Sequence, residues 1–132
     1  MSIGRVAIAA LAAAVAAVIG NFIIATIFKS ISDIPAEFEP LNFGRFALFT
    51  IVGVIGAAIV YWILGKLGGD PVKRFYIIAL IVLVLSFIPD FGLLSSDFMP
   101  GATMAGVMAL MLMHVVTAVA CIILFPRLAP PA

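Results

Sequence analysis

Residues 102–125 read ATMAGVMALMLMHVVTAVACIILF, a run of 24 residues without Asp, Glu, Lys or Arg, and this run decides the fold. A helix rises about 1.5 Å per residue, so about 20 apolar residues cross the ~30 Å hydrocarbon core of a bilayer. His114 is the only titratable group in the run besides Cys121. We therefore expect a transmembrane helix over residues 102–125.

Three further apolar runs precede this one, at residues 6–28, 46–64 and 75–94, and only Asp90 interrupts them with a charge. The composition agrees, because 66% of the chain is hydrophobic and 10% is charged. Soluble domains average about 45–50% apolar and about 25% charged residues, so these charges are too few to cover a water-facing surface. The sequence predicts an all-α, antiparallel four-helix transmembrane bundle that forms a single domain over residues 1–132.

The third run is bounded by polar residues and prolines. Asp70 is expected to cap this helix, and Pro71 to occupy its first position, where a missing N–H costs nothing. Pro89 is expected to mark a kink or a boundary near the far membrane interface. We therefore assign Asp90 to the acidic connection between the last two helices.

Basic residues gather on one side of the expected bundle. Four spans place both termini and the middle loop on the same side, which carries five basic residues against two on the other. Because basic loops are retained in the cytoplasm, we expect both termini to be cytoplasmic (N-in, C-in), in the inner membrane of a bacterium. The five are Arg5, Lys66, Lys73, Arg74 and Arg127, and the two are Lys29 and Arg45.

Small residues recur at a spacing of four in three of the runs. Helices in lipid associate at such positions, because small side chains let the backbones approach closely. The pattern favours packing within the bundle, and it also suits contact with a partner protein. The predicted helix-packing residues are Ala9, Ala13, Ala17, Gly53, Ala57, Ala105, Gly106 and Ala109.

Six polar residues at membrane depth need hydrogen-bonding partners: Asn21, Thr26, Thr50, Ser86, His114 and Thr117. A polar group left unsatisfied in hydrocarbon is costly, so each should face protein. As a neutral imidazole, His114 can donate to a backbone carbonyl or to Asn21. Alternatively, it binds a cofactor such as haem, bacteriochlorophyll, quinone or copper. We expect no acidic residue at its depth, which argues against a proton relay.

Methionines accompany His114 in the last run. Met104, Met108 and Met111 share one helical face, and thioether and imidazole groups suit Cu(I). Methionine also fills irregular gaps in a core. The other three runs contain no Met, His or Cys, so a copper site would need an oligomer, and no metal ligand is assigned.

No set of catalytic residues is recognised. We expect His114 to lie away from the aspartates, so that no Ser-His-Asp arrangement forms. The acidic loop at residues 30–44 favours a solvated loop over a cation site or a site for a basic partner. The sequence therefore predicts a protein that is not an enzyme.

Two stretches resemble a known family. These are FYIIALIVLVLSFIPD at residues 75–90 and GATMAGVMALMLMHVVTAVAC at residues 101–121. They resemble small, uncharacterised bacterial four-helix membrane proteins that are grouped as a domain of unknown function. The resemblance implies this topology over nearly the whole chain and implies no activity. It also draws attention to Ser86, Asp90 and His114 as a shared polar feature.

The function expected first is that of a non-enzymatic structural or accessory subunit of a larger membrane complex, which docks through the small-residue stripes. The alternative is a binder of a small intramembrane ligand at His114. A weaker alternative is a subunit of an oligomeric channel or transporter. The expected partners are the lipid bilayer and either other membrane subunits or further copies of the chain. A net charge of +1 provides no basic field for nucleic acid.

Overall fold

Four long helices make up the computed structural model, which describes residues 1–95 and 99–131. Each helix has a stretch long and apolar enough to cross a membrane, and the described residues contain no strand. The predicted all-α class with four membrane-spanning helices is therefore confirmed. The elements are α1 (Ile3–Ile31), the 3-10 helix η1 (Glu39–Leu41), α2 (Phe43–Lys66), α3 (Pro71–Ser95) and α4 (Met104–Leu128).

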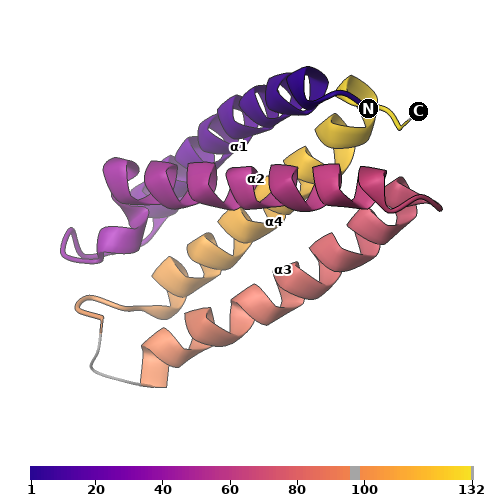
Figure 1. Cartoon of the computed structure of the whole chain (residues 1–132). Coiled ribbons are helices and arrows are strands. Elements are labelled where there is room, and N and C mark those ends of the chain that lie inside the picture. The colour runs from indigo at the N-terminus through magenta and orange to yellow at the C-terminus, as the bar shows by residue number, and fades with distance from the viewer. Residues whose placement is uncertain (96–98, 132) are drawn as a thin grey trace.

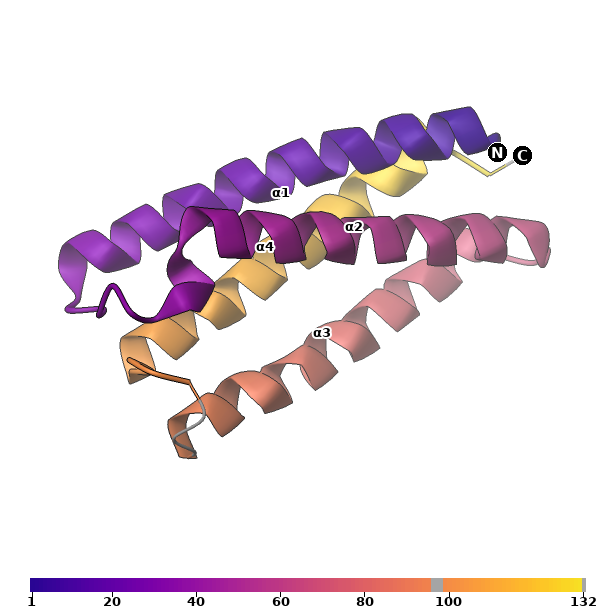
Figure 2. The same cartoon turned by 60° about the vertical axis from the view of Figure 1, so that its left-hand side comes forward.

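The helices alternate in direction, so the bundle has two distinct ends (Figures 1 and 2). Both termini lie beside the α2–α3 turn, and we call this the terminal end. The α1–α2 and α3–α4 connections lie at the opposite, loop end. Helices α2 and α3 meet at their turn and diverge toward the loop end in both views.

The small-residue stripe of α1 lies inside the bundle. Ala9, Ala13 and Ala17 are fully buried. One turn further along, a Cβ added to Gly20 would lie 2.7 Å from Cγ1 of Val116 on α4. Small side chains on α1 thus allow the close approach of α4, and this stripe is not free to dock a partner.

In the stripes of α2 and α4, some of the predicted packing residues are buried and others are exposed. On α4, Gly106 and Ala109 are buried, and Ala105 is half-buried. The prediction for Gly53 on α2 is wrong, because this residue is exposed and an added Cβ would meet nothing within 4 Å. Since α2 diverges from α3, its small residues, including the half-buried Ala57, line an opening.

Helix α3 starts as the sequence predicts. The backbone N–H of Lys73 donates to Oδ1 of Asp70 at 3.1 Å, and Pro71 is the first helical residue. Gly68 and Gly69 form the preceding turn with φ of +72° and +75°, values that favour glycine. The α2–α3 connection is therefore short and sharp.

Of the two alternatives given for Pro89, the boundary is wrong, because α3 continues through this residue to Ser95, close to the end of the expected span over residues 75–94. Proline removes one backbone hydrogen bond, but transmembrane helices tolerate this where neighbouring groups satisfy the freed carbonyl. Asp90 therefore lies within the helix and is buried, instead of lying in a solvated connection. In contrast, α4 begins two residues later than expected, because the side chain of Thr103 caps it by accepting from the N–H of Gly106 at 3.1 Å.

Aromatic side chains close both ends of the bundle. At the loop end, Phe38 is buried against Gly106, where an added Cβ would lie 2.9 Å from Cε2 of Phe38. At the terminal end, the rings of Tyr61, Phe75 and Phe125 pack with centroids 5.0 to 5.6 Å apart. Between these two closed ends, α2 and α3 leave space.

Candidate functional site

A cleft of about 950 Å³ lies between α2 and α3, with α4 as its floor. Its lining is mainly apolar, and its volume falls within the range of about 300–1,000 Å³ that is usual for small-molecule sites. Gly53, Gly56 and Ala57 widen it on the α2 side, because they present little or no side chain. The polar residues that line the cleft are Asn21, Glu39, Arg45, Thr50, Ser86, Asp90, His114 and Thr117.

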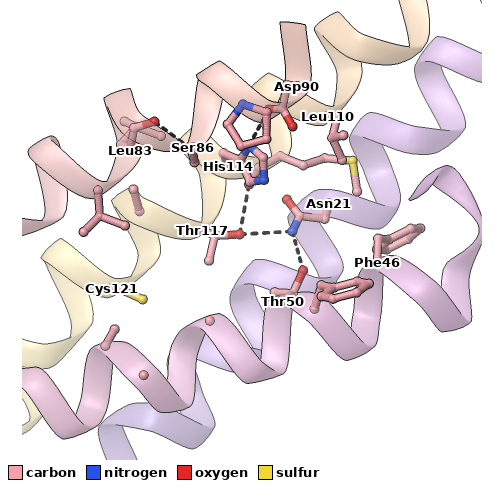
Figure 3. A pocket seen from close by; sticks show the side chains of 18 of the residues that line it. Asn21, Phe46, Thr50, Leu83, Ser86, Asp90, Leu110, His114, Thr117 and Cys121 are labelled. Carbon is pink, nitrogen blue, oxygen red and sulfur yellow. Dashed lines mark hydrogen bonds and ion pairs between the residues drawn. The ribbon is translucent and has the colours of Figure 1, made fainter. Parts of the chain in front are cut away.

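A carboxylate and an imidazole meet in this cleft (Figure 3). Nδ1 of His114 lies 2.8 Å from Oδ2 of Asp90 as an ion-pair contact, and neither atom forms a hydrogen bond in the described part of the chain. The Asp90 side chain is 6% exposed and that of His114 is 36% exposed. The expectation that no acidic residue would lie at the depth of His114 is therefore wrong. The continuation of α3 past Pro89 brings Asp90 to this position.

The contact with Asp90 fixes which face of the imidazole remains available. A carboxylate oxygen opposite Nδ1 favours a proton on that nitrogen, as in the carboxylate–histidine pairs of metal and ligand sites. No described residue forms a hydrogen bond with Nε2 of His114. The ring therefore presents Nε2 to any molecule in the cleft.

A second polar group joins three helices beside His114. Nδ2 of Asn21 on α1 donates to Oγ1 of Thr50 on α2 at 2.9 Å and to Oγ1 of Thr117 on α4 at 3.1 Å. The hydroxyl of Thr117 in turn donates to the carbonyl of Met113 at 2.9 Å. Asn21 thus bonds to threonines, and the expected hydrogen bond from His114 to Asn21 does not form. Oδ1 of Asn21 has no partner, although the residue is only 1% exposed.

A family model matches this chain over residues 2–131. The chain belongs to a family of unknown function, DUF6069. The predicted resemblance to a family of unknown function is confirmed over nearly the whole chain. No curated protein and no solved structure matches it. Membership of DUF6069 assigns no activity, so the chemistry of the cleft has to indicate the function.

Ser86, also predicted at membrane depth, forms a hydrogen bond within its own helix in this DUF6069 protein. The hydroxyl of Ser86 donates to the carbonyl of Leu83 in its own helix at 2.6 Å. Such bonds are common for serine in transmembrane helices and leave the side chain able to accept a further hydrogen bond. Ser86 lines the cleft one turn before Asp90, but it does not bond to the Asp90–His114 pair.

The three methionines predicted to share a face beside His114, Met104, Met108 and Met111, do not line the cleft, whereas Met99 does. Met104 and Met108 are exposed on the outer face of α4, whereas Met113 is buried and lines the cleft. Among the described residues, no group of three or more His, Cys, Asp and Glu side chains is placed to hold a metal ion.

The acidic loop of this DUF6069 protein carries a surface ion pair. Nη2 of Arg45 lies 2.7 Å from Oε2 of Glu39, and both side chains are exposed. Exposed pairs of this kind contribute little to stability. The pair lies at the loop end of the cleft, where it adds a polar rim.

Sequence reasoning named Asp90 and Thr50 but predicted the partner of neither. The signal for Asp90 was present, because the apolar run continues after it as Phe91-Gly92-Leu93-Leu94. A helix that includes these residues places Asp90 one turn after Ser86, at membrane depth. Thr50 is recognisable from the sequence as a polar residue in an apolar run, but no local signal identifies its partner, since only the crossing of α1 over α2 brings it to Asn21.

Proposed function

We propose that this protein binds a small, lipid-soluble molecule in the cleft between α2, α3 and α4, with the polar group of the ligand at His114. The observation that carries the proposal is the Asp90–His114 pair, which opens onto an apolar cleft of about 950 Å³. Ionisable residues at membrane depth are costly to bury and usually serve a function. The pair is not needed to fill a tightly packed core, because it lies beside open space.

The lining of the cleft supports a ligand that arrives from the bilayer. Phe49, Gly53 and Val82 line the cleft and are exposed on the outer surfaces of α2 and α3. They lie within the membrane-spanning stretches, so the mouth of the cleft faces hydrocarbon. A molecule dissolved in the bilayer can therefore reach His114 without crossing water.

The length of the cleft suits a ligand that consists of a polar head group and an apolar chain. The lining extends from Glu39 and Arg45 at the loop end to Phe75 near the terminal end. The polar residues occupy one part of it, and apolar side chains line the remainder. Among the ligands considered, an isoprenoid quinone or a similar tailed molecule matches this division better than haem or bacteriochlorophyll, whose macrocycles are broad and planar.

The first expected function, that of an accessory subunit, has less support. Its docking stripes on α1 and α4 are largely buried within the bundle. Among the predicted stripe residues Gly53 on α2 is the one that is exposed, and it lines the cleft together with the half-buried Ala57. A partner helix would therefore have to occupy the same cleft, and the experiment that tests the proposal also detects it.

The test is purification from native membranes in mild detergent, with the bound small molecules identified by mass spectrometry and by the absorption spectrum. Gly53→Phe places a large side chain in the cleft, where an added Cβ meets no atom within 4 Å. Val52→Phe is the matched control, because Val52 is 56% exposed on the same helix and does not line the cleft.

We expect a stoichiometric small molecule in the wild type and in Val52→Phe, and its loss in Gly53→Phe. A molecule retained by Gly53→Phe contradicts binding in the cleft. A stoichiometric membrane protein in place of a small molecule supports the accessory-subunit function instead.

A further inference from the structure

Asn21 lines the cleft with its hydrogen-bond donors used and its acceptor unused. Each amide nitrogen carries two hydrogens, and Nδ2 of Asn21 donates both of them, to Thr50 and to Thr117. Oδ1 of the same amide is buried and accepts no hydrogen bond. Asn21 therefore has no donor left for a ligand and has one unused acceptor.

The hydrogen bonds of Thr117 establish the orientation of this amide. The hydroxyl of Thr117 donates its single hydrogen to the carbonyl of Met113, so the Thr117 oxygen can only accept from Asn21. The amide nitrogen must then face Thr117, and Oδ1 must point away from it. Figure 3 shows this oxygen on the side of the amide nearer to His114.

Two other hydroxyls that line the cleft are already used as donors within the protein. The hydroxyls of Ser86 and Thr117 donate to carbonyls of their own helices. A buried acceptor without a donor is unfavourable, so Oδ1 of Asn21 is explained by a partner that supplies a hydrogen.

We infer that the head group of the ligand carries a hydroxyl that donates to Oδ1 of Asn21 beside His114. The ligand class is therefore a lipid-soluble alcohol, phenol or quinol, and not a ketone, ester or oxidised quinone, which only accept. The inference rests on the proposed function and specifies the chemistry of the molecule bound in the cleft.

Two redox-inert probes that differ in one hydrogen-bond donor test this inference. They are para-decylphenol and para-decylanisole, in which a methyl ether replaces the hydroxyl. Cys121 is the only cysteine, and it is buried and lines the cleft, so occupancy should slow its labelling by a maleimide in lipid nanodiscs. Affinities are expressed per mole fraction in the lipid, which removes the difference in partitioning.

The phenol should protect Cys121 with an affinity about tenfold higher than that of the anisole, the effect of one net hydrogen bond. In Asn21→Leu the ratio should fall to about one, because the acceptor is lost. Thr50→Val is the control that removes one hydrogen bond of Asn21 and keeps Oδ1, so the phenol should still bind more tightly. If Asn21→Leu does not fold, the ratio in the wild type alone decides the matter.

The outcomes separate the inference from the proposed function. Equal affinities of phenol and anisole in the wild type overturn the inference and leave binding in the cleft intact. A native ligand that lacks a hydroxyl or other donor does the same. No protection by either probe, in a protein that also purifies without a small molecule, overturns both.

Discussion

Replacement of Gly20 by alanine should destabilise the contact between α1 and α4. The added Cβ would lie 2.7 Å from Cγ1 of Val116, whereas carbon atoms in contact are usually about 3.5–4.0 Å apart. Val116 or the helix must therefore move by about 1 Å. Overpacking of this kind costs about 1–3 kcal/mol, and the better helix propensity of alanine offsets at most about 1 kcal/mol. We expect a net loss of about 1–2 kcal/mol.

The matched control is Gly53→Ala, which makes the same chemical change in a transmembrane helix. An added Cβ at Gly53 meets nothing within 4 Å, so only the gain in helix propensity applies. The difference between the two variants therefore isolates the steric cost at the α1–α4 contact.

The assay is the rate at which a maleimide labels Cys121 in the native protein. Cys121 is the only cysteine and is 4% exposed, so in the ligand-free protein its labelling reports transient opening of the bundle. A loss of about 1–2 kcal/mol raises this rate about 5- to 30-fold, since 1.4 kcal/mol corresponds to a factor of ten. Equal rates in Gly20→Ala and Gly53→Ala would refute the close packing of α1 against α4.

Three further substitutions test other parts of the structure. Phe38→Ala removes the buried ring that closes the loop end and should lower the free energy of unfolding by about 3–5 kcal/mol. An unchanged melting temperature would show that the loop does not pack as described. Tyr61→Phe removes the hydrogen bond from the Tyr61 hydroxyl to the carbonyl of Ala129 at 2.8 Å and should cost about 0.5–1.5 kcal/mol, so a variant as stable as the wild type would exclude a contribution from this bond. Asp90→Leu should shift the proton of His114 from Nδ1 to Nε2 in nitrogen-15 NMR spectra, and the same tautomer in both proteins would disprove the pairing.

The number and class of the helices could be predicted because a membrane imposes a local requirement on the sequence. Each helix must satisfy its own backbone hydrogen bonds and present an apolar surface along about 20 residues. Runs such as residues 6–28 and 102–125 meet that requirement without reference to any other part of the chain. The same reasoning applies to Asp70 and Pro71, whose preferences at a helix start are also local.

The site could be predicted only in part, because it depends on how the helices cross. Periodicity identified His114 and Asn21 as polar groups in need of partners, but it does not specify the rotation of α3 against α4 that brings Asp90 to His114. The usual effect of proline on helices placed Asp90 outside α3, whereas proline is tolerated within a bilayer. Similarly, the spacing that includes Gly53 shows where small residues lie, and not whether another helix approaches them.

A structure of the protein purified from its native membrane, determined without the addition of any ligand, tests the central claim most directly. We predict an elongated molecule in the cleft between α2 and α3, with its polar group within hydrogen-bonding distance of Oδ1 of Asn21 and beside the His114 ring. A cleft closed by α3 packing against α2, or occupied by a helix of another protein, would contradict the account.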